Sequence, residues 1–414
     1  MMKDTLRPGV LAGAALLLAF ALPSCAETGT NGDADADLWI DVSENIDGIP
    51  DQAPPDGDAD GGDDLPGEQP PDADAAEDAP AEADAEVWEC GCPDPVLPPC
   101  AAPERITFSV WDDSMIEQLT TAMACATETL DIAIYDAQWA CVTDAIMRAT
   151  ELNPDLAVRI ITEKDNCGTP AALTCDLSRL AGAGRATVLL DTRSYLMHHK
   201  FVLVDAGQPD AMAIFGSANW TTQGFCEEYN CNVVIDDETI IDALSAEFDR
   251  MFAGDFGVTP WTEPISATGI DLYFSPSGAD WQDRIVAQID ALGATATLHF
   301  MVASFTRQDI ADAMIAAHGR GVTVTGLVSR LFAAEPAVAS MLAAGIQVRK
   351  DLVHHKVTFI ESGADRIVFI GSGNYSTNAR DENNEAVAEM RGDTALYDAL
   401  LDEFGRIWAA ADTI

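Results

Sequence analysis

The stretch "LMHHKFVLVDAGQPDAMAIFGSANWT", residues 196–221, opens with two histidines and a lysine and closes with a Gly-Ser-x-Asn turn. The stretch "LVHHKVTFIESGADRIVFIGSGNYS", residues 352–376, repeats this layout near the C-terminus. Four of the six histidines and two of the five lysines of the chain lie in these two HHK triplets. In a chain so poor in cations, the repeat predicts a duplicated fold that delivers one such strand from each half.

Strand geometry separates the two histidines of each triplet. Successive side chains of a strand point to opposite faces, so the first histidine and the lysine share a face. The pairs His198/Lys200 and His354/Lys356 are therefore the candidates for chemistry. The middle histidines, such as His199, point the other way, and we expect them to pack or to form hydrogen bonds behind the strand.

An imidazole beside an ammonium group suits a substrate with an anionic oxygen. The lysine neutralises charge while the imidazole attacks or moves a proton. The Gly-Ser-x-Asn turns can add hydroxyl, amide and backbone N–H donors to the same oxygens through Ser217, Asn219, Ser372 and Asn374. Two halves related by an approximate two-fold axis would bring two imidazoles together. A two-step displacement at phosphorus needs this pair, one as nucleophile and one as acid.

The doubled HxK(x)4D and GSxN pattern resembles the phospholipase D superfamily, and the resemblance covers roughly residues 106–410. It implies an α/β fold of two similar sandwich lobes, each a mixed sheet flanked by helices. The lobes would be related by a pseudo-two-fold axis, with the active site at their interface. It also implies a covalent phosphohistidine intermediate, with no metal and no cofactor. The motif acids Asp205 and Glu361 complete the catalytic set, and Glu361 stands where the family has aspartate.

The resemblance also singles out a position 11 residues past each motif asparagine, where a glutamate of the family orients a histidine. Glu385 stands there in the second half, but Asn230 stands there in the first. Family precedent makes His198 the nucleophile and His354 the general acid. An amide can orient an imidazole, but it does not stabilise the imidazolium as a carboxylate does. The asymmetry could therefore support the reverse assignment, and the order of the two roles stays open.

The N-terminus predicts export. Lys3 and Arg7 precede the apolar run "GVLAGAALLLAFAL", which is too short for a permanent membrane span. The run ends in "LPSC", which resembles the lipobox of bacterial lipoproteins. We therefore expect a signal peptide over residues 1–25, lipidation of Cys25 and anchoring in the cell envelope, with Ala26 favouring the outer membrane. The alternative is an ordinary cleaved signal with an incidental cysteine.

Residues 26–89 contain 22 acidic side chains and no lysine or arginine between Glu27 and Glu89. Such a segment cannot bury enough apolar surface to fold, which predicts a disordered linker before a first lobe at 90–255 and a second at 256–414. The formal net charge is -47. Long-range repulsion of polyphosphate by this charge makes a nucleic-acid partner less favoured.

The hydrophobic pattern predicts the same order of elements in both halves. Residues 130–137 and 156–165 read as strands around a helix at 142–152. In the second half, strands at 296–305 and 322–328 enclose a helix at 307–321. A strand-helix-strand crossover implies parallel pairing, which supports the α/β class.

Nine cysteines follow Cys25, and an exported chain favours disulfides. Two close pairs can bridge locally: Cys167/Cys175 and Cys226/Cys231. Three cysteines just after the linker are expected to form a small knot or, less favoured, part of a zinc site: Cys90, Cys92 and Cys100. Because nine is odd, one thiol stays free or pairs outside the chain.

The leading functional hypothesis is a monomeric, lipid-anchored enzyme that hydrolyses a phospholipid head-group ester to phosphatidate and an alcohol. The predicted anchor, the extracytoplasmic address and the acidic surface favour lipid. A nuclease that uses the same site on DNA or RNA is the alternative. A non-catalytic surface binding protein is a third hypothesis, against which the intact motifs argue.

Overall fold

A computed structural model of the chain describes residues 90–94, 96–169 and 171–414. The predicted signal peptide, the lipidation site Cys25 and the acidic linker lie outside the described residues. Within the described ranges, no helix combines the length and hydropathy that crossing a membrane requires.

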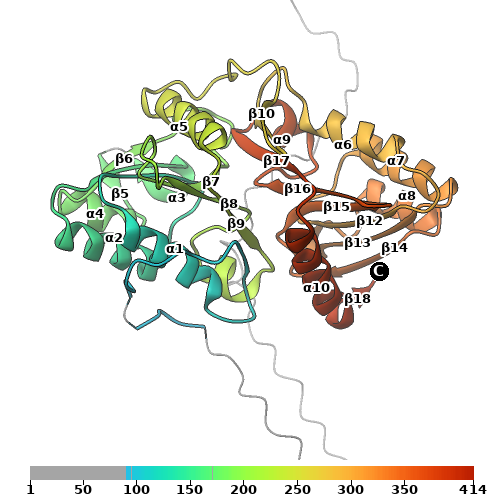
Figure 1. Cartoon of the computed structure of the whole chain (residues 1–414), viewed down its shortest axis with the longest axis horizontal. Helices are drawn as coiled ribbons and strands as arrows, with labels where there is room; N and C mark the ends of the chain where they lie inside the picture. Colours follow the sequence, from blue (N-terminus) through green and yellow to red (C-terminus); the bar gives the residue numbers. More distant parts are fainter. Residues whose placement is uncertain (1–89, 95, 170) are drawn as a thin grey trace, which may run out of the picture. The chain divides into compact units, whose positions relative to one another are not determined.

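The first lobe is a seven-stranded sheet with its helices, drawn in blue to yellow-green in Figure 1. Its strand order is β1-β9-β8-β7-β2-β3-β6. The strands are β1 (Ile106–Phe108), β2 (Thr129–Ile134), β3 (Ala157–Thr162), β6 (Thr187–Leu190), β7 (Lys200–Val204), β8 (Met212–Gly216) and β9 (Cys231–Ile235). The helices are α1 (Ser114–Cys125), α2 (Ala140–Leu152), α3 (Lys164–Cys167), α4 (Leu177–Gly182) and α5 (Glu238–Phe252), and a two-stranded ribbon joins β4 (Gly168–Thr169) to β5 (Ala172–Leu173).

The second lobe is a nine-stranded sheet with its helices, drawn in yellow to dark red (Figure 1). Its order is β10-β11-β17-β16-β15-β12-β13-β14-β18. The strands are β10 (Ile265–Ala267), β11 (Ile270–Ser275), β12 (Thr297–Val302), β13 (Thr323–Ser329), β14 (Gln347–Asp351), β15 (Lys356–Ser362), β16 (Asp365–Gly371), β17 (Glu385–Arg391) and β18 (Asp412–Thr413). The helices are α6 (Trp281–Asp290), α7 (Gln308–Gly319), α8 (Pro336–Ala343), α9 (Thr377–Asp381) and α10 (Thr394–Ala410).

The two sheets share one plan, which confirms the predicted α/β class. The predicted crossovers are present, because β2 pairs in parallel with β3 and β12 pairs in parallel with β13. The strands that follow the HHK triplets are antiparallel to these, β7 beside β2 and β15 beside β12. Each sheet is therefore mixed, and corresponding strands occupy corresponding places.

The interface between the lobes is apolar. One continuous core cluster contains Phe201 and Phe215 from the first sheet together with Val357 and Val368 from the second. A Cβ added to Gly371 would lie 2.9 Å from Cζ of Phe215 and 2.2 Å from a backbone oxygen of the neighbouring strand β17. The glycine of the second GSxN turn is thus required chiefly by the close approach of β17, and the Phe215 ring of the other lobe packs against the same position.

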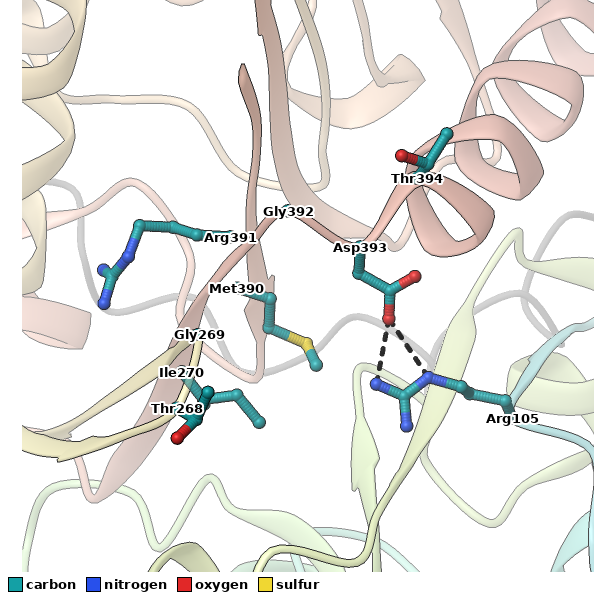
Figure 2. Close-up of a pocket in the computed structure, with 9 residues that line it drawn as sticks. All are labelled: Arg105, Thr268, Gly269, Ile270, Met390, Arg391, Gly392, Asp393 and Thr394. Carbon is teal, nitrogen blue, oxygen red and sulfur yellow. Dashed lines mark hydrogen bonds and ion pairs between the residues drawn. The ribbon is translucent and has the colours of Figure 1, made fainter. Parts of the chain in front are cut away.

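A second contact between the lobes lies in the wall of an open pocket of about 490 Å³ (Figure 2). The guanidinium of Arg105 donates two hydrogen bonds, of 2.9 and 3.1 Å, to Oδ2 of Asp393, which caps α10. The pocket is lined by residues of the β10–β11 turn and of the end of β17. None of the predicted site residues lines this pocket, so it is not the candidate active site.

Four disulfides are formed in the first lobe: Cys90–Cys226, Cys92–Cys141, Cys100–Cys125 and Cys167–Cys175. The local Cys167–Cys175 bridge is confirmed, but the Cys226–Cys231 bridge is wrong. Cys231 starts β9 with its side chain in the apolar core, where it remains a free buried thiol. The predicted knot is also wrong, because each of its three cysteines ties the start of the described chain to a different part of the lobe.

Candidate active site

The histidine pairs lie where the two sheets meet. His198 and His354 are 4% and 8% exposed, and Lys200 and Lys356 are 4% and 2% exposed. The regular strands β7 and β15 begin at the lysines, and the histidines lie in the extended segments just before them. Both lysines lower the pKa of both imidazoles, which shows that the four side chains share one environment.

The segments that precede the histidines are paired across the interface. Next to His198, Met197 forms an isolated parallel bridge with Asn384, and the backbone N–H of His198 donates to the oxygen of Asn384 at 3.0 Å. In the same way Val353 bridges Tyr229, whose oxygen accepts from the backbone N–H of His354 at 2.9 Å. Asn384 is followed by Glu385, and Tyr229 is followed by Asn230. His198 therefore lies beside Glu385 of the other lobe, and His354 lies beside Asn230 of the other lobe.

This crossing gives His198 a carboxylate. Nδ1 of His198 lies 2.8 Å from Oε1 and 2.9 Å from Oε2 of Glu385. Burial raises the pKa of Glu385 to about 8. Burial, and then the charges of Lys200 and Lys356, hold the pKa of His198 well below its usual value. When Glu385 is ionised, the imidazole is neutral with its proton on Nδ1, and Nε2 carries the free lone pair.

His354 has an amide as its hydrogen-bond partner instead, and a partly exposed carboxylate, Glu228, lies farther off at 3.7 Å from Nδ1. Nδ1 of His354 lies 2.8 Å from Oδ1 of Asn230. The amide orientation is fixed, because Nδ2 of Asn230 donates to the carbonyl oxygens of Gly224 and Glu228 at 3.0 and 3.2 Å. Oδ1 must therefore accept the proton of Nδ1. Burial, followed by the charges of the two lysines, holds the pKa of His354 well below its usual value.

The motif lysines are held by the backbone of their own triplets. Nζ of Lys200 donates to the carbonyl oxygen of His198 at 3.1 Å, and Nζ of Lys356 donates to that of His354 at 2.7 Å. The Lys200 ammonium also lies 4.8 Å from the ring centroid of Tyr135, whose ring packs edge-on against His198. Two fixed ammonium groups beside two imidazoles make a site suited to an oxyanion.

The serines of the two GSxN turns support the orienting residues rather than the expected phosphate oxygens. Oγ of Ser217 donates to Oδ1 of Asn230 at 2.9 Å. A hydrogen bond from the Ser372 side chain lowers the pKa of Glu385 in the matching place. Each hydroxyl proton is used within the protein. The asparagines of the turns, Asn219 and Asn374, are buried and partly buried after β8 and β16.

The motif acids lie outside the chemistry, which corrects their place in the predicted catalytic set. Asp205 lies five residues past Lys200, about 16 Å along an extended strand. Its carboxylate accepts backbone N–H bonds of 2.7–2.9 Å from residues 127–129. Burial alone would raise the pKa of Asp205, but these bonds lower it. Glu361 is more exposed and pairs with Arg366 at 3.2 Å. Both acids hold strands in place.

The middle histidines lie behind the strands, as strand parity predicts. Nε2 of His199 lies 3.7 Å from Glu247 of α5, and Nε2 of His355 lies 3.6 Å from Glu403 of α10. All four side chains are fully buried. An arginine three residues along the same helix pairs with each glutamate at 2.7 Å.

A repeated sequence pattern marks these two glutamates, which are absent from the predicted site residues. Each begins a Glu-Phe-x-Arg segment, at residues 247–250 and 403–406. Each lies 48 residues past the middle histidine of its own lobe. A third residue that was not predicted is Glu163, which is fully buried and accepts the backbone N–H of Met197 at 2.9 Å, next to His198. Nothing in its local sequence distinguishes it.

Within the described ranges, no group of three or more histidine, cysteine, aspartate or glutamate side chains is arranged to hold a metal ion. Positive charge at the site comes from Lys200 and Lys356.

Comparison with known proteins agrees with this geometry. The family model described as "Cardiolipin synthase, PLD-like domain" matches residues 119–252 and 286–408, which together are more than half of the chain. The chain therefore belongs to the phospholipase D superfamily.

Among similar proteins, the mitochondrial cardiolipin hydrolase of Xenopus laevis is 30% identical over 164 residues, which is 39% of this chain and 71% of that protein. The phosphatidylserine synthase of Haemophilus influenzae has a similar structure, with a TM-score of 0.55 at 11% identity over 76% of this chain and 89% of that one. A polyphosphate kinase from Porphyromonas gingivalis gives a TM-score of 0.54 at 14% identity over 72% of this chain and 46% of that one. At these identities, the two structures show the shared fold alone.

Proposed function

We propose that this protein is a phosphodiesterase that hydrolyses the head-group ester of phospholipids, giving phosphatidate and an alcohol. The observation that carries the proposal is the pair of buried imidazoles with unlike partners, Glu385 on His198 and Asn230 on His354. Two ammonium groups beside them supply the charge that a phosphodiester needs.

In the first step, Nε2 of His198 attacks phosphorus. The P–N bond forms as the bond to the head-group oxygen breaks, and His354 gives a proton to the departing alkoxide. The imidazolium that forms at His198 keeps its Nδ1 proton on the Glu385 carboxylate, which stabilises the phosphohistidine. Lys200 and Lys356 bind the phosphoryl oxygens throughout.

In the second step, water attacks phosphorus and gives its proton to His354, while the P–N bond breaks and returns the electron pair to His198. His354 suits both steps because the amide of Asn230 fixes the ring, while the carboxylate of Glu228 lies 3.7 Å from Nδ1, beyond hydrogen-bond distance. Burial, and then the charges of the two lysines, lower its pKa. A bound phosphate anion offsets the lysines, and the imidazole then holds a second proton on Nε2. The unlike partners thus support His198 as nucleophile and His354 as acid and base.

Several observations support a lipid as the substrate. The net charge of -47 disfavours a polyanion. Among the similar proteins, the Xenopus laevis relative is named for hydrolysis of cardiolipin. We also propose that the protein is exported and anchored as a monomer through lipidated Cys25, facing lipid in the bacterial outer membrane.

The test uses the full chain with Cys25→Ser, so that no acyl group is attached. Phosphatidylcholine vesicles and single-stranded DNA are offered separately, each with and without EDTA. We expect choline release that persists in EDTA and is lost in His198→Ala. Cleavage of DNA without choline release would replace the proposal with a nuclease, and loss of turnover in EDTA would overturn the metal-independent mechanism.

A further inference from the structure

Exposed apolar side chains gather around the candidate site. In the part of the chain that the structure describes, seven large hydrophobic side chains are exposed. Four of them follow strands or helices at the edge where the histidines lie: Tyr195 (39%), Val258 (70%), Leu331 (70%) and Leu352 (44%). The other three lie on helices α2 and α10 and at the C-terminus.

The first two of these side chains belong to one cluster in front of His198. Tyr195 lies three residues before His198, and the Arg193 guanidinium lies 5.6 Å from its ring centroid. The same guanidinium donates to the backbone oxygens of Phe256 and Glu382 at 2.6 and 3.1 Å. This contact ties the loop that carries Val258 to the loop that carries Tyr195.

The other two form a matching cluster in front of His354. Leu352 lies two residues before His354, and its backbone N–H donates to Asp351 at 2.9 Å. The same carboxylate oxygen accepts a 2.9 Å hydrogen bond from Arg330, the residue before Leu331. Leu331 and Leu352 are therefore neighbours at the ends of the parallel strands β13 and β14.

We propose that these four side chains form a lipid-docking rim, which inserts into a phospholipid surface and presents the head-group phosphate to the imidazoles. This inference rests on the proposed function. Because His198 and His354 are at most 8% exposed, the molecule that carries the phosphodiester must contact the surrounding rim.

The charge of the rim fits a lipid surface rather than a polynucleotide. One arginine lies next to each cluster of the rim, and both are already paired. Arg330 pairs with Asp351 at 2.9 Å, and Arg193 pairs with Glu382 at 3.9 Å. A polynucleotide would need a track of cations that release counterions on binding. An apolar rim with neutralised charges instead suits a zwitterionic interface, where burial of apolar area drives insertion.

The test measures partition of the chain from residue 26 onward, which carries neither the apolar leader nor an acyl group, onto sedimenting phosphatidylcholine vesicles. Two double variants, Leu331→Ser/Leu352→Ser and Tyr195→Ser/Val258→Ser, remove one cluster each. We expect each to weaken partition by about tenfold, since each removes two inserting side chains. The matched control is Leu152→Ser, which is 63% exposed at the end of α2, before the opposite end of β3. It should partition like the parent.

A parent that does not bind vesicles, or double variants that partition like the control, would overturn the lipid-docking rim. Weaker binding of single-stranded DNA in the double variants, with unchanged vesicle binding, would also overturn it. Failure of the proposed function is a different result. In that case the parent binds vesicles through the rim and is folded by circular dichroism, but it releases no choline.

Discussion

Glu385 of the second lobe lies 2.8 Å from Nδ1 of His198 in the first lobe. The histidine proposed as nucleophile and the carboxyl group that orients it therefore come from different lobes. The reciprocal contact, between Asn230 and His354, makes the two halves interdependent but chemically unlike. Duplication supplied two similar strands, and the exchange of partners across the interface gave them different roles.

The two histidines should fail in different ways. We expect His198→Ala to lose roughly 10⁴-fold in turnover and to form no phosphoenzyme. His354→Ala should lose about 10²- to 10⁴-fold on a lipid, but it should still form the phosphoenzyme from bis(p-nitrophenyl) phosphate, whose leaving group needs no proton. Rapid-quench detection of acid-labile phosphate separates them. A phosphoenzyme in His198→Ala but none in His354→Ala would reverse the assignment.

Ionisation of Glu385 should appear in the pH dependence. Because burial raises the pKa of this carboxyl to about 8, its carboxylate form, which keeps the His198 proton on Nδ1, gains population as pH rises through about 8. We expect phosphoenzyme formation to rise over that range. Glu385→Gln should lower the rate and remove this rise. An unchanged pH profile in that variant would contradict the prediction.

The Glu385 carboxyl should also make the free energy of unfolding depend on pH. The direction should be opposite to that given by a carboxylate in an ordinary ion pair. The pKa of Glu385 is raised on folding, so the folded state binds more protons than the unfolded state between about pH 4.3 and the folded value near 8. Stability should therefore fall as pH rises across that window. Thermal unfolding should show a flatter slope for Glu385→Gln, and an identical slope would count against the raised pKa.

Asn230 should resist replacement by its acid. Its Nδ2 donates to the carbonyl oxygens of Gly224 and Glu228, so Asn230→Asp would set a carboxylate oxygen against two acceptors. We expect a loss of about 1–3 kcal/mol in the free energy of unfolding. Denaturant titration measures it, with Gln347→Glu at an exposed position of β14 as the control. Equal stability of the two variants would show that the amide orientation is not fixed as described.

The free thiol should be hidden. In the full chain with Cys25→Ser, eight of the remaining nine cysteines are in disulfides, and Cys231 is buried in the core. Burial also raises the pKa of its thiol strongly, which keeps the reactive thiolate scarce. One thiol per chain should react with a thiol reagent after unfolding in denaturant and none before. A second thiol, or rapid reaction in the native protein, would contradict the pairing.

Much of this arrangement was accessible from the sequence, because strand and helix periodicities are local properties. The α/β crossovers, the shared face of His198 and Lys200, and the reversed direction of His199 all follow from side-chain alternation along a strand. The Cys167–Cys175 bridge was predictable for the same reason, since its residues are eight apart. Local patterns misled where Cys226 and Cys231 were close in sequence but faced different surroundings.

What the sequence by itself determined is the chemical inventory: two imidazoles, two ammonium groups, one carboxyl and one amide at matched offsets. Only the tertiary structure decided that Glu385 meets His198, a residue 187 positions away, rather than the histidine of its own lobe. The physical reason is that the partner of each histidine is set by parallel pairing across an apolar interface between two sheets. No periodicity within either lobe encodes how those two surfaces face each other.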